Sequence, residues 1–282
     1  MSNCRLFISC HQKASFPQNE LLAPVQVGTA LSAERFDGFL YDDDGENISC
    51  KNRSYCELTA QYWAWKNADA EYLGFFHYRR FLYPDCTAGR PYRIEEEPTQ
   101  QLLDKLGYAG FEDLIGQYDL IAPMGENMFV PVREHYARAP HHYGKNLDTV
   151  EAIIREKHPD MVGAMESYLS GTVAYFGNIY IMSRAVFHAY CAWLFPILEE
   201  FDRRTDISGY SAQEKRVDGY LAERMFGIYL TYVRGGLRVL ELPRVHFQKD
   251  RTARMKQKMI GALLPAGSRR RAWVKAKIKG LN

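Results

Sequence analysis

Short apolar segments that alternate with helical patterns limit most strongly how this chain can fold. Apolar runs occupy residues 5–10, 39–41, 72–83, 118–123, 174–182 and 238–247, the last interrupted by a proline. Helical patterns cover residues 55–67, 147–158, 159–169, 184–201 and 216–233. Strands that alternate with helices favour an α/β fold, because helices cross between parallel strands. The sequence therefore predicts one domain over residues 1–250, with a mostly parallel central sheet flanked by helices.

Polar residues follow several of these predicted strands directly. In an open α/β sheet, ligands bind beyond the carboxyl ends of the strands. The residues in that position are the first candidates for a functional site, namely His11, Asp42 to Asp44, His77 to Arg80, Asn178 and His246.

The composition predicts a globular chain without a membrane span. Of the 282 residues, 46% are hydrophobic and 25% are charged, which is usual for a soluble domain. No run reaches the roughly 18 apolar residues of a spanning helix, and the start is too short and polar for a signal peptide. The six cysteines form no CxxC pair. We expect a cytoplasmic protein with reduced thiols.

The last 32 residues form a basic tail. Residues 251–282 hold ten Lys and Arg and no Asp or Glu, and because the whole chain carries +2, residues 1–250 carry −8. Apolar residues interleave with these charges at helical spacing, in a first segment around Met255 and Met259 and a second around Trp273 and Ile278. Basic amphipathic segments suit an anionic membrane surface. We therefore predict a peripheral position at the inner face of the plasma membrane; a helix packed on the acidic body, or a tail without a role, are the alternatives.

Several common chemistries are absent from the sequence. It contains no GxGxxG, no GxxxxGK[ST], no HExxH and no GxSxG. The acidic turn that starts at Asp42 does not fit a calcium loop, because its sixth and twelfth positions are Asn47 and Arg53. The histidines of residues 135–142 lack a zinc-ligand spacing.

Residues 41–66 are dense in hydrogen-bonding groups. Asp42, Asp43, Asn52 and Glu57 could hold sugar hydroxyls, the edge of a base or a cation. If a cation such as Mn²⁺ or Mg²⁺ takes part, Asp42 and Asp43 are its candidate ligands. The alternative is an Asx-rich turn that caps the following helix.

The tetrapeptide His77-Tyr78-Arg79-Arg80 follows an apolar strand. A guanidinium matches phosphate oxygens, so this motif predicts a pyrophosphate contact by Arg79 or Arg80 together with His77. Alternation along a strand would point the two arginines to opposite faces, so that one of them touches the ligand. A purely structural role of the motif is the alternative.

Several segments together resemble a known bacterial family. They are HQK at 11–13, PVQVG at 24–28, DDDGENIS at 42–49, KN at 51–52, YCELT at 55–59, YWAWKN at 62–67, HYRR at 77–80, YCAWLFP at 190–196 and GYLAER at 219–224. In this order they are similar to the family called domain of unknown function 4422, over about residues 4–248. The resemblance implies a glycosyltransferase of capsule, O-antigen or exopolysaccharide synthesis, and some members are regarded as galactofuranosyltransferases.

A second resemblance concerns the fold of nucleotide-sugar transferases of the GT-A type. These have a helix and then a strand that ends in Asp-x-Asp, which holds a metal on the donor diphosphate. Here His77-Tyr78-Arg79 stands at that place. This departure implies either neutralisation of the diphosphate by arginine or a metal held elsewhere. Asn178 resembles a residue of the acceptor-side strand, and His246 resembles a late histidine that touches the donor phosphate.

The resemblances imply a glycosyltransferase that moves a sugar from a UDP-sugar donor to a growing, lipid-linked glycan. The donor contacts are then His11, Asp42, Asp43, Asn52, Glu57, Arg79, Arg80 and His246, and the acceptor contacts are Asn178, Tyr136 and His142. His77 would assist the leaving group. For the catalytic base we predict Glu223, with Asp218 next; an ion pair between Glu223 and Arg224 is the open alternative.

A second class of function also fits the composition. Tyr, Trp and Phe make up 13% of the chain, which suits a glycan-binding or assembly protein without catalysis as well. A nucleic-acid binder rests on the basic tail alone. The acidic body argues against it, because a binding face usually extends onto the domain. We therefore expect no nucleic-acid partner.

Overall fold

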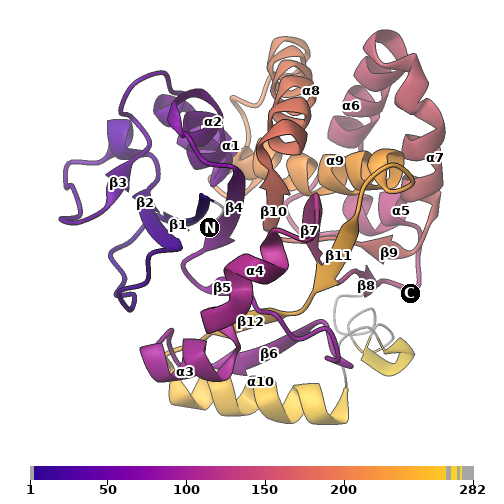
Figure 1. Ribbon diagram of the computed structural model, residues 1–282. Coiled ribbons are helices and arrows are strands. Elements are labelled where there is room, and N and C mark those ends of the chain that lie inside the picture. The colour runs from indigo at the N-terminus through magenta and orange to yellow at the C-terminus, as the bar shows by residue number, and fades with distance from the viewer. Residues whose placement is uncertain (1–2, 265–267, 272–273, 275–282) are drawn as a thin grey trace.

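The central element of the fold is a mostly parallel sheet (Figure 1). The structure is a computed structural model, and it describes residues 3–264, 268–271 and 274. The main path of the sheet runs β11-β7-β10-β4-β1-β2-β3. These strands are β1 (Cys4–Cys10), β2 (Leu22–Gln26), β3 (Leu40–Tyr41), β4 (Tyr72–His77), β7 (Leu120–Pro123), β10 (Tyr180–Ser183) and β11 (Val239–Leu242).

Only β10 runs against its neighbours on this path within the described chain. It pairs antiparallel with β4 and β7, whereas β4-β1, β1-β2, β2-β3 and β7-β11 are parallel pairs. The carboxyl ends of β1 to β4 therefore lie at one edge of the sheet. This arrangement confirms the predicted mostly parallel sheet of an α/β fold.

The sheet branches beyond β4. Strand β5 (Arg80–Leu82) pairs antiparallel with β4, then β12 (Arg244–Phe247) pairs with β5, and β6 (Tyr92–Glu95) runs parallel to β12. Pro243 separates β11 from β12, because proline lacks the N–H that a continuous ladder needs. The predicted last strand thus divides between the main path and the branch.

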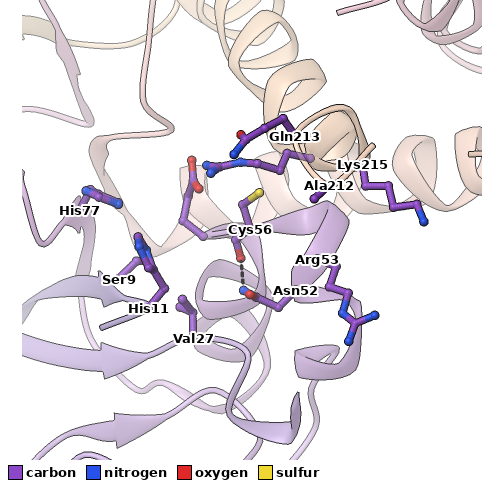
Figure 2. A pocket seen from close by; sticks show the side chains of 12 residues that line it. Ser9, His11, Val27, Asn52, Arg53, Cys56, His77, Ala212, Gln213 and Lys215 are labelled. Atoms are coloured by element: carbon purple, nitrogen blue, oxygen red, sulfur yellow. Dashed lines mark hydrogen bonds between the residues drawn. The ribbon is translucent and has the colours of Figure 1, made fainter. Parts of the chain in front are cut away.

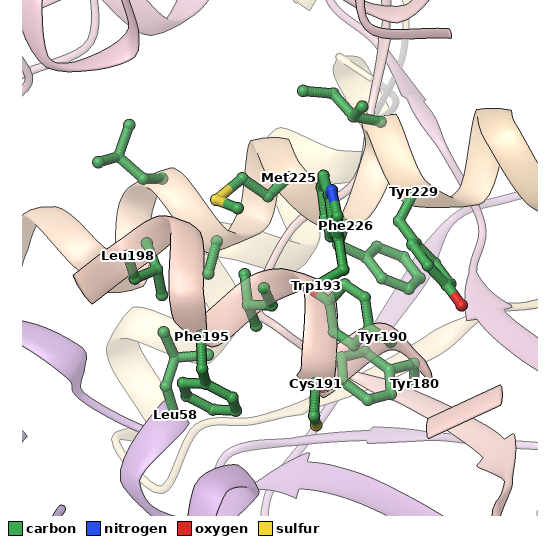
Figure 3. Packing of buried hydrophobic residues seen from close by; sticks show 14 of the residues in the cluster. Leu58, Tyr180, Tyr190, Cys191, Trp193, Phe195, Leu198, Met225, Phe226 and Tyr229 are labelled. Carbon is green, nitrogen blue, oxygen red and sulfur yellow. The ribbon is translucent and has the colours of Figure 1, made fainter. Parts of the chain in front are cut away.

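Long helices cover the sheet and supply most of its core. They are α2 (Leu58–Asn67), α6 (Gly144–Lys157), α7 (Val162–Ser170), α8 (Arg184–Arg204) and α9 (Val217–Val233). Figure 3 shows aromatic residues of α8 and α9 packed against Tyr180 of β10. The rings of Tyr180 and Phe226 stack at 5.1 Å, and all these side chains are buried. A second buried cluster joins β1, β5, β7, β12 and α4 (Phe111–Ile115) on the other side of the sheet.

Shorter elements complete the described chain. The helices are η1 (Thr29–Leu31), η2 (Ser49–Lys51), α1 (Asn52–Tyr55), α3 (Gln100–Lys105), η3 (Tyr108–Gly110), α5 (Val132–Ala137), η4 (Pro159–Met161), η5 (Glu214–Arg216) and α10 (Arg251–Leu263). Strands β8 (Glu126–Asn127) and β9 (Val173–Ala174) pair with each other.

Three predicted elements are interrupted in the structure. The helix over 55–67 is broken at Cys56, whose φ is 52°, so that α1 and α2 are separate. The strand over 174–182 is broken by Gly177 and Asn178, both with positive φ. The strand over 72–83 is a hairpin, because His77 pairs with Arg80 across a two-residue turn. In each case the apolar pattern of the sequence is continuous, but the backbone changes direction within it, and hydrophobic periodicity does not indicate such a change.

The basic tail begins with a regular helix. Helix α10 lies along the outside of the molecule next to β6 (Figure 1), and Arg254 forms an ion pair of 2.7 Å with Glu96. Trp273 and Ile278 of the predicted second amphipathic segment lie outside the described residues. None of the helices in the described part of the chain has the length and apolar character that crossing a bilayer requires.

Candidate functional site

A cavity of about 520 Å³ lies at the carboxyl ends of β1 and β4. Figure 2 shows His11 and His77 on one side of it, with Ala212, Gln213 and Lys215 across from them. Its lining residues are Ser9, His11, Val27, Asn52, Arg53, Cys56, Glu57, His77, Ala212, Gln213, Lys215 and Arg216. The cavity has the size and the position at the sheet edge that a small-ligand site of an α/β fold has.

The two histidines of the cavity are neutral near pH 7. Burial lowers the pKa of His77 to about 2, with further lowering by Arg80 and Arg79. Burial, Arg79 and Arg216 also lower the pKa of His11. The Nδ1 atom of His77 accepts the backbone N–H of Arg79 at 3.2 Å, which assigns the proton to Nε2. His77 therefore acts at this site as a neutral hydrogen-bond donor.

Three cations supply the positive charge of the cavity. Arg53, Lys215 and Arg216 line it, and no ion pair of these three side chains occurs among the described residues. We call them the cationic wall. These three cations outnumber Glu57, the one carboxylate among the lining residues of the cavity, and this balance favours an anionic ligand, since a guanidinium or ammonium group binds phosphate oxygens well.

The hairpin separates the side chains of Arg79 and Arg80, by a turn and not by alternation along one continuous strand. Arg79 is exposed in the turn, with its guanidinium 5.1 Å from the centre of the Tyr78 ring. Arg80 opens β5 opposite His77, and residues opposite each other in a ladder share a face of the sheet. The charge of Glu223 opposes the lowering of the pKa of Arg80 by burial. Arg80 thus lies beside the cavity together with His77, whereas Arg79 covers the Tyr78 ring.

Two carboxylates meet at the turn that breaks the 174–182 segment. The Oε1 atom of Glu57 accepts a hydrogen bond from Nδ2 of Asn178 at 2.8 Å, and Oε1 of Glu223 accepts the N–H of Gly177 at 2.6 Å. Gly177 has a φ of 97°, which a residue with a Cβ rarely adopts. Burial raises the pKa of Glu57, and the nearby charge of Glu223 raises it further. The turn therefore fixes both carboxylates, and of the two it is Glu57 that lines the cavity.

The two predicted catalytic carboxylates lie behind the cavity lining. The side chain of Glu223 is 18% exposed, and its Oε2 atom is 3.6 Å from the guanidinium of Arg224, so the alternative ion pair is present. Asp218 is fully buried and accepts the hydroxyl of Ser54. Burial and the charge of Asp202 raise its pKa to about 7. Asp218 is therefore enclosed between α1 and α9, out of reach of a ligand in the cavity.

Asp42 holds the loop after β2 in place. Its carboxylate accepts the N–H of Gly28 at 2.7 Å, the N–H of Thr29 at 3.0 Å and the hydroxyl of Ser49 at 2.6 Å. Asp43 forms an ion pair of 2.7 Å with Arg35. Asp42 thus binds the backbone at the start of η1, whereas the predicted alternative was a turn that caps the following helix, and neither α1 nor α2 has a side-chain cap. The role of Asp42 or Asp43 in donor binding stays a prediction.

Asn52 connects this loop to the cavity, which it lines. Its Nδ2 atom donates to the Cys56 carbonyl at 2.7 Å and to the Thr59 hydroxyl at 3.1 Å. Gly28 packs so closely on Asn52 that a Cβ atom there would lie 2.6 Å from Oδ1 of Asn52, and its φ is 69°. Glycine is therefore required at this position to bring the β2 loop against the cavity.

His246 lies in a different cavity. Its ring stacks on Tyr92 at 4.4 Å in a space of about 260 Å³ that Gln257 and Ile260 of α10 also line. Burial lowers the pKa of His246 to about 2, with further lowering by Arg244 and Arg80. His246 pairs with Arg80 across β12 and β5, which leaves it one strand away from the main site.

The predicted acceptor residues Tyr136 and Asn178 are buried, whereas His142 is only partly buried. Tyr136 is fully buried and Asn178 is 4% exposed, so both belong to the support of the site. The ring of His142 stacks on Tyr220 at 4.1 Å. Beside it, Tyr143 contacts Tyr210 with a ring distance of 4.8 Å. These four rings lie on the segments that flank the 212–216 side of the cavity.

The fit to a metal ion is poor. Within the described ranges, no group of three or more His, Cys, Asp or Glu side chains has the geometry of a metal site. The oxygens of Asp42 already accept three hydrogen bonds, and Asp43 pairs with Arg35. In the described part of the chain, Asp42 and Asp43 are therefore already engaged by protein groups and do not form the predicted site for Mn²⁺ or Mg²⁺.

The cationic wall was not predicted from the sequence. Lys215 and Arg216 directly precede α9, where cations oppose the helix dipole. Because a basic pair at the start of a helix is unfavourable by itself, the position of Lys215 and Arg216 in the sequence was the sign that could have identified them as functional residues. Arg53, Cys56 and Gln213 carry no comparable signal, since only the tertiary fold brings them to β1 and β4.

The family of the chain follows from its match to a family model. The model described as a domain of unknown function (DUF4422) matches residues 5–234. The chain belongs to this family. The match includes the hairpin, the cationic wall and both carboxylates at the Gly177-Asn178 turn.

A solved structure of an enzyme has a similar fold. The apo structure of WbbM, described as a bifunctional glycosyltransferase, matches with a TM-score of 0.83 and 30% sequence identity. The match covers 87% of this chain and 45% of WbbM, so the chain spans less than half of that protein. No curated protein matches the chain significantly. The likeness confirms the expected resemblance to a glycosyltransferase fold.

Proposed function

We propose that the protein is a glycosyltransferase that uses a nucleoside diphosphate sugar. The observation that carries this proposal is the cationic wall beside two neutral histidines, in a chain whose fold is similar to that of a glycosyltransferase. The family resemblance favours a UDP-sugar, with galactofuranose as the first sugar to test, and a lipid-linked surface glycan as the acceptor.

The donor diphosphate is proposed to lie between the cationic wall and His77. When the sugar departs, negative charge builds up on the diphosphate, and fixed donors stabilise it best where charge develops. Arg216 and Lys215 supply positive charge on one side. The Nε2–H group of His77 supplies a neutral hydrogen bond on the other.

Glu57 is proposed to be the base of an inverting transfer. The acceptor hydroxyl oxygen forms a bond to the anomeric carbon while the bond from that carbon to the diphosphate breaks, and the hydroxyl proton passes to Glu57. A raised pKa makes a carboxylate a better base near neutral pH. Asn178 and Glu223 then act as positioning residues, because they hold Glu57 and the turn beside it.

The acceptor glycan is proposed to contact the rings of His142, Tyr143, Tyr210 and Tyr220. Aromatic faces suit sugar rings, since they combine apolar area with a polar edge. The segments that carry these rings flank the Ala212–Arg216 side of the cavity, so a glycan held there would present its terminal hydroxyl toward Glu57.

Nucleotide release from UDP-sugars tests the proposed function. The purified protein should release UDP from at least one UDP-sugar, and faster when a glycan acceptor is present. A non-catalytic glycan-binding protein would bind the glycan without binding or consuming any nucleotide sugar. That second result would replace the proposal with the rival function.

Turnover should continue in the presence of a chelator. The cationic wall offers three positive charges to the diphosphate, and the candidate metal ligands Asp42 and Asp43 already bind backbone N–H groups, Ser49 and Arg35. We expect rates with and without EDTA to agree within about twofold, a difference below 0.5 kcal/mol in the barrier. Complete loss of turnover with EDTA, restored by Mn²⁺, would show that a metal neutralises the diphosphate instead.

A further inference from the structure

Helix α10 is built with its apolar side chains facing outward. Met255, Met259 and Leu263 are 56%, 63% and 73% exposed, and their spacing of four residues places them on one stripe. On the inner side, Arg254 pairs with Glu96 and donates to the Gln248 carbonyl at 2.7 Å. A helix that turns its arginine inward and its apolar residues to solvent has its outer face available for a partner.

Positive charges border this apolar stripe. Arg251 and Lys256 are exposed, and neither forms an ion pair within the part of the chain that the structure describes. Lys258 lies 3.7 Å from Glu95. No Asp or Glu occurs from residue 251 to residue 282, although residues 1–250 carry −8. The stripe and its basic border form one surface, which we call the α10 face.

We propose that the α10 face binds the surface of an anionic lipid bilayer. An apolar stripe inserts between lipid head groups while flanking Lys and Arg contact the anionic phosphates. Two α10 faces brought together in a symmetric dimer would oppose basic residues with basic residues, so charge complementarity favours the lipid. The contact of α10 with β6 and the Arg254-Glu96 ion pair leave this face on the outside of the domain.

Vesicle co-sedimentation with the full chain tests this proposal. The protein should bind vesicles containing phosphatidylglycerol, should not bind pure phosphatidylcholine, and should be released by salt. The variant Met255→Ser/Met259→Ser/Leu263→Ser should bind about tenfold more weakly, and Arg251→Gln/Lys256→Gln should lose most of the salt-sensitive part. The matched control Leu31→Ser/Leu40→Ser removes apolar residues of 47% and 41% exposure far along the chain, and should bind as the wild type does.

Three results would overturn the proposal. They are the absence of vesicle binding at low salt, equal binding of the Met255-Met259-Leu263 variant, and a concentration-dependent dimer on gel filtration that this variant abolishes. The last result would assign the α10 face to a second copy. The assay contains neither donor nor acceptor, so its outcome is independent of whether the proposed transferase activity is found.

Discussion

Glu57→Gln should lower the rate of sugar transfer by roughly 10²- to 10⁴-fold, the usual contribution of a general base. Glutamine keeps the hydrogen bond from Asn178 and the volume of the side chain, but it cannot accept the hydroxyl proton. The affinity for UDP should change little, because the base acts on the acceptor. Steady-state kcat and KM, with UDP binding measured by calorimetry, check this expectation.

Two further variants test whether Glu57, and not another carboxylate, is the catalytic base. Glu71→Gln removes an exposed carboxylate distant from the cavity and should leave kcat unchanged. Glu223→Gln should reduce kcat to a smaller extent, because Glu223 supports the turn through the Gly177 N–H. If Glu223→Gln abolishes transfer while Glu57→Gln retains it, then Glu223 is the base, as the sequence predicted.

Arg216→Ala should weaken UDP binding by roughly 10- to 100-fold. A hydrogen bond to a charged group contributes about 1.5–3 kcal/mol, and every 1.4 kcal/mol is tenfold in Kd. Arg216 has the clearest position for such a contact, since it lines the cavity and its charge lowers the pKa values of both His11 and His77. Calorimetric titration with UDP measures the effect directly.

The shape of the guanidinium provides the control for Arg216. Arg216→Lys keeps the charge but loses the planar fork, so it should recover only part of the affinity. Lys105→Ala removes an exposed cation on α3 and should bind UDP normally. Wild-type affinity in Arg216→Ala would exclude the cationic wall as the diphosphate site and would direct attention to Arg80.

Much of the sheet could be predicted because each strand is a short apolar run with a sharp polar end. His11 and His77 were placed correctly at strand ends for this reason, and both line the cavity. The breaks at Cys56 and Asn178 could not be predicted, since a left-handed backbone in a residue with a side chain leaves no mark on hydrophobic periodicity. Yet these breaks bring Glu57 and Asn178 into contact.

Residue type alone also does not reveal the surroundings of two candidate residues, whose roles in donor binding stay predictions. Asp42 belongs to an acidic run that suggests a ligand site, but its oxygens accept hydrogen bonds from the Gly28-Thr29 backbone instead. His246 ends a strand as a ligand-binding residue would, but Pro243 moves that strand to the branch of the sheet. Such outcomes depend on contacts between distant segments, which one sequence does not reveal.

The position of α10 next to β6 determines how far the cavity would lie from a membrane that binds the α10 face. Three residues join β12 to α10, and Arg254 connects the start of the helix to Glu96 and to the Gln248 carbonyl. With the α10 face flat on a bilayer, the mouth of the cavity stands at one height and in one orientation. If the acceptor is lipid-linked, as we propose, a glycan growing from its lipid anchor would meet the cavity only when its end has reached that height. Membrane binding through the α10 face would then select acceptors by length before any sugar is recognised.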